Sequence, residues 1–358
     1  MLFYHDARSI LRRKKMKRAL TIALLVIASA TLVFAQGTVD KADKVYTLKL
    51  AYTPTAMDPN DSPDVMYGEV FKTYVEEQSK GRIIVDIYPG GQLGNAAEFV
   101  QGVSSGAIEM AVINISMLNN IYKPTMLLSI PGLFGSIEEC NDVLNGEWGQ
   151  SMFEEVNNVA NIRIMNTGSN GFRHFTNKIR EVKTMQDTRG ITFRVMENPV
   201  SVRMVEAMGA RAVPMPGSEM YMAMKTGVVD GQENPILNII QDKTFEVQKY
   251  LTLDGHMASI MAYIINDGVF TSLPKDLQKV VLEGSKQATK AANDVISIRN
   301  KEGLEFLKKQ GMIVTQPTAE ALEAWHSTIF NATQSFVRAE IGDKMVDSLI
   351  DALDAYRK

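Results

Sequence analysis

The stretch VYTLKLAY at residues 45–52, followed by VMYGEVFKTYVEEQSK at 65–80 and RIIVDIY at 82–88, decides the fold class. The first and last segments have the apolar composition of strands, and the middle segment has the spacing of an amphipathic helix. The same order continues with a helix at 95–105 and an apolar strand at 108–113. Strands separated by helices of this length predict an α/β fold whose parallel sheet is covered on both faces.

The alternation resumes further along the chain and predicts a second α/β unit. Its expected strands are residues 163–167, 191–195 and 210–214, and its expected helices are residues 200–208 and 218–226. The chain is also longer than the size at which one hydrophobic core usually stops growing. We therefore expect two domains.

The rest of the chain supplies connections between these units. Residues 250–254 and 258–265 are predicted to be strands that return between the domains, which would fix a hinge. Residues 274–310 form a run almost free of helix breakers and predict a helix of roughly 50 Å, long enough to cross both domains. Two more helices are expected, at 318–336 and 341–356.

The N-terminus has the layout of a secretory signal. Basic residues crowd positions 12–18, and the apolar run 19–35 follows, with cleavage expected after Ala35 unless Met16 is the true start. An uncleaved membrane anchor is the alternative, although the run is short of the ~20 residues that span a bilayer. We expect a periplasmic protein whose signal peptide is residues 1–35.

These patterns give domain boundaries. Domain I is expected to comprise residues 36–170 plus about 256–300, and domain II residues 171–255 plus about 301–358.

Charge and cysteine content exclude some functions. The chain has 38 Lys and Arg against 41 Asp and Glu, and residues 1–35 hold seven of the former and one of the latter, so the mature chain carries about −9. This acidity argues against a nucleic-acid partner. Cys140 is the single cysteine, so no intramolecular disulfide forms.

The sequence contains no recognisable catalytic, metal-binding or cofactor motif. Its histidines are dispersed, and HExxH, CxxC, GxSxG and Walker patterns do not occur. The strongest general acid–base pair is Asp230 with Glu233, for which a structural role is favoured. The glycine-rich piece PGGQLGN at 89–95 is either a plain strand-to-helix turn or a nest for an anion. We therefore expect no enzyme, no metal and no cofactor.

Three further segments contain residues that suggest a ligand-binding site and a family resemblance. They are SNGFRHFTN at 169–177, ITFRVMENP at 191–199 and VPMPGSEMYMAMKTGVVDGQENP at 213–235. With FEVQKYL at 245–251 and the YPGGQLGN turn, they resemble the solute-binding proteins of tripartite ATP-independent periplasmic (TRAP) transporters of the dicarboxylate and organic-acid (DctP-like) type. The resemblance implies a two-domain periplasmic binding protein fold with a hinge and a long helix spanning both domains.

The resemblance also implies what the protein does. It would bind a small carboxylated solute between its domains and deliver it to TRAP permease subunits in the membrane, working as a monomer. An exported enzyme acting on sugar acids and a sensor subunit that presents its ligand to a receptor kinase remain alternatives.

Arg194, at the end of the ITFRV strand, is the leading candidate for the ligand contact. Its planar guanidinium matches a carboxylate with two parallel hydrogen bonds, and a salt bridge to Glu197 is the alternative. By resemblance, Arg194 clamps the carboxylate, Arg173 forms a second positive wall and Asn234 hydrogen-bonds the ligand. The full set of candidate ligand-binding residues is Arg173, Arg194, Asn234, Glu197, Asn198, Gly217, Thr53 and Asn114.

Some positions depart from the family pattern. Asn95, Ala96, Ile115 and Met117 replace the charged residues of sialate-binding members, which argues against sialate. Gly217 replaces an aromatic residue that stacks on the ligand in many relatives, while Met257 and Met261 are expected to form an adaptable apolar far wall. We expect a compact, uronate-like sugar acid first, and a more apolar oxo or aromatic acid second.

Overall fold

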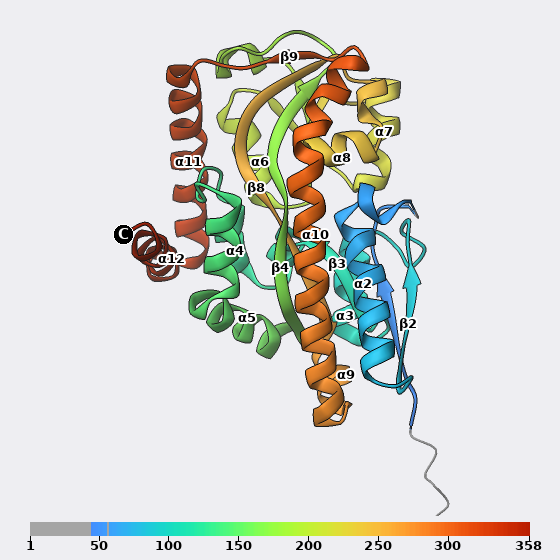
Figure 1. Cartoon of the computed structure of the whole chain (residues 1–358). Helices are drawn as coiled ribbons and strands as arrows, with labels where there is room; N and C mark the ends of the chain where they lie inside the picture. Colours follow the sequence, from blue (N-terminus) through green and yellow to red (C-terminus); the bar gives the residue numbers. More distant parts are fainter. Residues whose placement is uncertain (1–43, 56) are drawn as a thin grey trace, which may run out of the picture. The chain divides into compact units, whose positions relative to one another are not determined.

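A mixed β-sheet runs through the molecule in the computed structural model, which describes residues 44–55 and 57–358 (Figure 1). Within the described chain the strand order is β2-β1-β3-β8-β4-β7-β5-β6, and β9 pairs with β8. The strands are β1 Tyr46–Ala51, β2 Ile83–Tyr88, β3 Met110–Asn114, β4 Ile162–Asn177, β5 Thr192–Val195, β6 Arg211–Pro214, β7 Gly231–Pro235, β8 Tyr250–Asn266 and β9 Ile313–Thr315.

Helices cover the sheet. They are α2 Pro63–Gln78, α3 Ala96–Ser105, α4 Ile137–Asn145, α5 Glu147–Ala160, α6 Pro199–Ala207, α7 Gly217–Thr226, α8 Ile236–Gln241, α9 Asp267–Ser272, α10 Lys275–Lys309, α11 Ala319–Ile341 and α12 Asp343–Tyr356. Of these, α2, α3, α6, α7, α10, α11 and α12 follow the predicted positions, whereas α4, α5, α8 and α9 were not predicted. None of the helices in this part of the chain is long and apolar enough to cross a membrane. The expected signal peptide, residues 1–35, lies outside the described residues.

The sheet has two parallel halves joined by antiparallel strands. In the first half β1 pairs in parallel with β2 and β3, and in the second half β5 pairs in parallel with β6 and β7. Strands β4 and β8 lie between the halves and run antiparallel to each other, to β3 and to β7. The prediction of parallel α/β units is thus correct within each half, and the predicted returning strands lie at the centre. The strand expected at 163–167 belongs to this antiparallel centre and not to the second parallel unit.

Two long strands carry the chain between the halves. Strand β4 has 16 residues and β8 has 17, although the sequence patterns predicted only residues 163–167 of the first and two separate strands for the second. Their pairing is irregular between Ser169 and Phe172. Gly171 sits in this irregularity with φ of 97°, a conformation that favours glycine.

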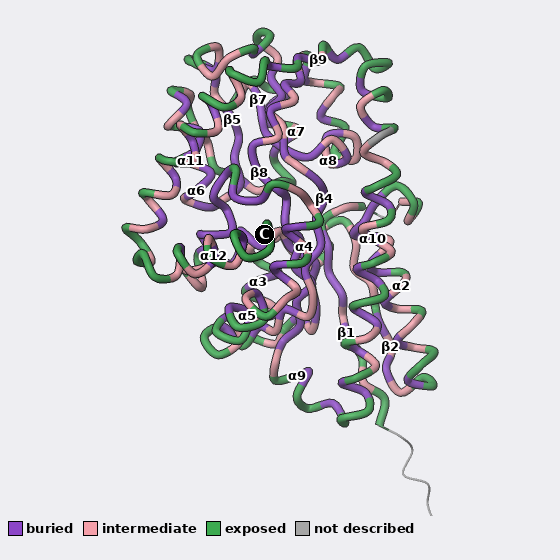
Figure 2. The backbone as a smooth tube through the Cα atoms, turned by 60° about the vertical axis from the view of Figure 1, so that its left-hand side comes forward, coloured by how far each residue is buried: buried purple, intermediate pink, exposed green. Residues whose placement is uncertain are grey.

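The core lies on both faces of the sheet, as the buried positions in Figure 2 show. On one face of the first half, Tyr67 and Phe71 of α2 pack with Leu277 and Val281 of α10. On the other face, side chains of α3, α4, α5 and α12 form one apolar cluster, which includes the buried thiol of Cys140. In the second half, Phe175, Phe193 and Trp325 are stacked or edge-on to one another.

Helix α10 has 35 residues and matches the predicted long helix within one residue at each end. It contacts α2 in the first half of the sheet and α8 beside the second half (Figure 1). Its two glycines, which lower helix propensity, lie at these contacts. A Cβ at Gly284 would meet Val75 Cγ2 at 2.6 Å, and one at Gly303 would meet Ile236 Cγ2 at 2.8 Å. The glycines therefore permit close helix packing.

Replacing Gly284 tests this packing. Gly284→Val should lower the free energy of unfolding by about 1–3 kcal/mol, because the added methyl groups overpack against α2. Urea titration followed by circular dichroism measures the change. Gln287→Val introduces valine at an exposed position of the same helix, without the close contact to α2, and should lose no more than about 0.7 kcal/mol. Equal losses at the two positions would contradict the close-packing role.

Candidate ligand-binding site

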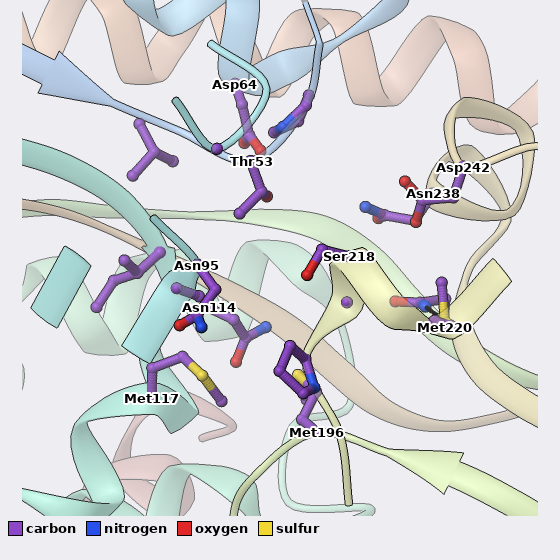
Figure 3. Close-up of a pocket in the computed structure, with 18 of the residues that line it drawn as sticks. Thr53, Asp64, Asn95, Asn114, Met117, Met196, Ser218, Met220, Asn238 and Asp242 are labelled. Atoms are coloured by element: carbon purple, nitrogen blue, oxygen red, sulfur yellow. Dashed lines mark hydrogen bonds between the residues drawn. The ribbon is translucent and has the colours of Figure 1, made fainter. Parts of the chain in front are cut away.

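A cavity of about 400 Å³ lies between the two halves of the sheet (Figure 3). Its first side comes from the loop after β1, the glycine-rich turn before α3, and the end of β3. Its second side comes from β4, β5, β7 and the start of α7. This volume is within the range of small-molecule sites. Among the predicted site residues, those that line it are Thr53, Asn114, Arg173, Arg194, Glu197, Gly217 and Asn234.

Arg194 is buried in the wall of this cavity, with 5% of its surface exposed. Its Nε and Nη2 donate to the carbonyl oxygen of Met215 at 3.0 and 2.8 Å, and its Nη1 lies 3.6 Å from Met220 Sδ. No carboxylate of the described residues is within salt-bridge distance, so the alternative pairing with Glu197 is not formed. A buried guanidinium with only neutral partners needs a counter-charge.

The electrostatics of Arg194 agree with this geometry. Burial is the main cause that lowers the pKa of Arg194, to about 10; Glu233 opposes this shift and Arg173 adds to it. The side chain is still protonated at neutral pH. The cavity wall therefore carries a positive charge that the protein does not neutralise by direct contact.

Arg173 also lines the cavity, but its charge is matched by the protein. Its Nε and Nη2 are ion-paired with both carboxylate oxygens of Glu233, Nη1 donates to Ser259 Oγ at 3.2 Å, and Nη2 donates to Asn234 Oδ1 at 2.9 Å. The structure thus places the predicted second arginine, Arg173, in the cavity wall, where Glu233 fixes its side chain and neutralises its charge.

A chain of buried charges continues from Arg173 away from the cavity. Glu233 lies 3.2 Å from His256 Nε2, and His256 Nδ1 lies 2.6 Å from Asp254 Oδ2. Burial opposes the charged form of each group. The attraction of Arg173 and His256 outweighs it and lowers the pKa of Glu233 to about 2, while Asp254 and Glu233 raise the pKa of His256 to about 9. The chain holds the guanidinium of Arg173 in place.

Two amides complete the polar wall near the arginines. Asn234 Nδ2 donates to Gln232 Oε1 at 2.7 Å, which fixes the amide that faces the cavity. Asn114 Nδ2 donates to Ser259 Oγ at 3.2 Å, while its Oδ1 caps the turn that begins at Ile115. Ser259 therefore links the end of β3 to Arg173 across the sheet.

Other predicted residues take varied positions. A Cβ at Gly217 would have Arg194 Nη2 as its nearest neighbour, at 3.8 Å, so this glycine leaves space beside the guanidinium. Asn198 does not line the cavity; its side chain caps α6 through Ser201. Of the expected methionine wall, Met261 lines the cavity, whereas Met257 packs in the apolar cluster that includes Val200.

The glycine-rich turn contributes backbone to the cavity. Gly90, Gly91 and Gly94 line it, together with Asn95, which begins α3 through a capping box with Glu98. The segment is therefore a strand-to-helix turn, as the first of the two interpretations predicted, and it also lies beside the cavity; the anion nest stays a prediction.

The residues that sequence reasoning missed are acidic or amide side chains on the cavity wall. Asp64 lies in the first turn of α2, Asn170 lies in β4, and Asn238 and Asp242 lie in and just after α8 (Figure 3). The pattern Ser62-Pro63-Asp64 is an ordinary helix start, in which an acid favours the helix dipole. It gave no sign that Asp64 would be buried against a cavity.

The strongest catalytic pair from the sequence does not reach the cavity. Asp230 Oδ2 accepts a hydrogen bond from the Thr192 amide at 3.0 Å, and Glu233 is held by Arg173 and His256. Both carboxylates hold neighbouring elements together. The residues that the structure describes also include no cluster of metal-ligating side chains.

Fold and site together define a solute-binding protein, in which a cavity between two α/β halves presents buried polar groups. The chain belongs to the bacterial extracellular solute-binding proteins of family 7, whose sequence profile matches residues 56–339. It is accordingly a TRAP transporter receptor for small organic acids, as its sequence resemblance predicted, and members of this family are periplasmic partners of membrane permease subunits.

Individual relatives support this assignment. A solute-binding protein of Verminephrobacter eiseniae is 32% identical over 69% of this chain and 73% of its own. The 2,3-diketo-L-gulonate-binding periplasmic protein YiaO of Escherichia coli is 27% identical over 68% and 74%. The sugar acid binding protein DctPAm of Advenella mimigardefordensis, solved with galactonate, has a TM-score of 0.82 at 27% identity, covering 87% of this chain and 99% of its own.

Asp64 predicts how stability depends on pH in the ligand-free protein. Burial, with Asp242 adding, raises the pKa of Asp64 from 3.8 to about 7, and Asp64 in turn contributes to the raised pKa values of Tyr52 and Tyr263. The raised pKa costs nothing well below the unfolded-state pKa of 3.8, and the full penalty appears above the folded-state pKa of about 7. Asp64→Asn should therefore gain stability over wild type as pH rises, by on the order of 1–4 kcal/mol at pH 8.

Urea unfolding at pH 5 and pH 8 measures this difference. Glu69→Gln, an exposed position on the same helix, is the matched control and should stay within about 0.5 kcal/mol of wild type at both pH values. A stability difference for Asp64→Asn that is the same at both pH values would show that Asp64 does not carry a buried charge.

Proposed function

We propose that the cavity binds a compact sugar acid with a single carboxylate, and that Arg194 makes the main contact with that carboxylate. The observation that carries this proposal is the buried guanidinium of Arg194, which contacts only a carbonyl and a thioether among the described residues. A carboxylate supplies the missing counter-charge and matches the planar fork with two hydrogen bonds.

The neighbouring residues have supporting roles in this proposal. Arg173, fixed by Glu233, orients Asn234 and Ser259 toward the carboxylate end of the ligand. Gly217 leaves the Arg194 fork open to the cavity. Thr53 and Asn114 contact the ligand from the first half of the sheet, and Glu197 borders the site from the second half.

The ligand class rests on two kinds of support. The cavity is lined by amides, hydroxyls and carboxylates as well as by Met117, Met196 and Met261, a mixture that suits a hydroxylated acid better than an apolar one. Among the relatives, one protein is named for 2,3-diketo-L-gulonate and one was solved with galactonate. A sugar acid is therefore the favoured ligand.

Binding is proposed to close two domains over the ligand. Domain I comprises residues 36–170 plus about 256–300, and domain II comprises residues 171–255 plus about 301–358. The irregular pairing of β4 with β8 between Ser169 and Phe172 is where the long strands would flex.

The remaining properties follow from this role. We propose that the protein acts as a monomer. We also propose that it is a receptor without catalysis, because the acidic pair Asp230 and Glu233 is committed to structural contacts. The signal peptide is cleaved after Ala35, which the intact mass of exported protein checks.

Arg194 substitutions test the proposal. Arg194→Ala should weaken binding of the tightest acid from a panel of aldonates and uronates by roughly 30-fold to several-thousand-fold, because one partner of a desolvated charge pair is lost. Arg194→Lys should also bind poorly, since a point charge cannot reproduce the fork. Isothermal titration calorimetry on refolded, ligand-free protein measures both. Affinity of Arg194→Ala within threefold of wild type would refute the role.

A further inference from the structure

Asp64 is a buried carboxylate whose partner is missing. Only 3% of its surface is exposed, it lines the cavity, and its Oδ1 has no hydrogen-bond partner in the described part of the chain. In Figure 3 it reaches from the start of α2 toward Thr53 and the pocket. A buried acceptor left without a donor costs about 1–3 kcal/mol, so this oxygen is poised to receive a hydrogen bond from whatever fills the cavity.

Asp242 lines the same cavity from the other half of the sheet. It follows α8 and lies beside Asn238 (Figure 3). Asp242 is itself exposed, and its charge acts on the pKa of Asp64, which neither arginine lowers.

A third acceptor lies in the same wall. Asn170 is 3% exposed and lines the cavity, and its Oδ1 has no partner among the described residues, while its Nδ2 lies 3.4 Å from Asn238 Oδ1. Asp64 and Asn170 thus each present to the cavity a buried acceptor that the described part of the chain does not satisfy.

We propose that Asp64 and Asp242 form a hydroxyl-reading end of the site, which accepts hydrogen bonds from the part of the ligand farthest from its carboxylate. This inference rests on the proposed function, because it takes Arg194 as the carboxylate partner. It assigns the ligand class as monocarboxylates with a hydroxylated tail and excludes dicarboxylates of the same carbon skeleton.

The exclusion follows from charge. A second ligand carboxylate at this end would stand against two protein carboxylates, and like charges placed together at an interface cost several kcal/mol. A terminal hydroxyl donates a hydrogen bond without adding charge. A site built to hydrogen-bond such a group also rejects analogues that lack it, because its buried acceptors would then stay unsatisfied.

An ammonium group could also donate to these carboxylates, but the observations favour a hydroxyl. The ligands named for the relatives, galactonate and 2,3-diketo-L-gulonate, end in hydroxyl groups away from the carboxylate.

The test uses matched six-carbon acids. The probes are D-gluconate and D-galactonate, their aldarates D-glucarate and galactarate, 6-amino-6-deoxy-D-gluconate, and hexanoate. Calorimetry on refolded wild-type protein is expected to show that at least one aldonate binds at least 30-fold, or about 2 kcal/mol, tighter than its aldarate, its amine analogue and hexanoate. Asp64→Asn should reduce the aldonate-to-aldarate ratio at least tenfold, and Glu69→Gln should leave that ratio unchanged.

Each contrary result overturns the inference. The first is that an aldarate, the amine or hexanoate binds as tightly as the aldonate. The second is that neither aldonate binds. The third is that the aldonate-to-aldarate affinity ratio of Asp64→Asn lies within twofold of the wild-type ratio. The proposed function fails separately: its failure is an aldonate affinity that Arg194→Ala leaves intact. If Asp64→Asn leaves the aldonate-to-aldarate affinity ratio unchanged while Arg194→Ala abolishes aldonate binding, only the present inference is contradicted.

Discussion

The buried positive charge of Arg194 is the constraint on which the arrangement of the cavity depends. The guanidinium is almost fully removed from solvent, and its contacts are the Met215 carbonyl and a methionine sulfur. A charge in this position lowers the stability of the empty protein, and the proposed ligand carboxylate would offset that cost. Arg173, by contrast, is neutralised by Glu233 and serves as a fixed neighbour. The two arginines therefore differ in role although they share one cavity.

The fold places these groups through its two long strands. Strand β4 carries Arg173 and Asn170 into the cavity, and β8 carries Ser259 and Met261 past the same point. Strand β5 ends at Val195, so Arg194 projects where its parallel sheet meets the loop before α6. Ligands of open α/β sheets bind outside the carboxyl ends of the strands, and the site follows that rule from both halves at once.

Local sequence predicted the elements and the arginine, but not the acidic end of the cavity. Arg194 could be predicted because it lies near the end of an apolar strand, where a charged side chain is unusual unless it binds an ion-pair partner or a ligand. Asp64 and Asp242 could not, since an acid at a helix start or after a helix end is common on surfaces, and only tertiary packing places it against a cavity. The second half of β4 was missed because SNGFRHFTN is polar, and its burial comes from partners far along the chain. Met257 was misplaced because irregular pairing interrupts the alternation that holds for Ser259 and Met261.

The free energy of unfolding of ligand-free Arg194→Met tests the central claim most directly. Methionine keeps the volume of the side chain and removes its charge. If the charge is a cost that the ligand offsets, urea unfolding of the refolded variant will show stability equal to or greater than that of wild type, and saturating ligand will stabilise wild type only. A loss of more than about 2 kcal/mol in the ligand-free variant would contradict the account, because it would show that Arg194 supports the fold rather than the ligand.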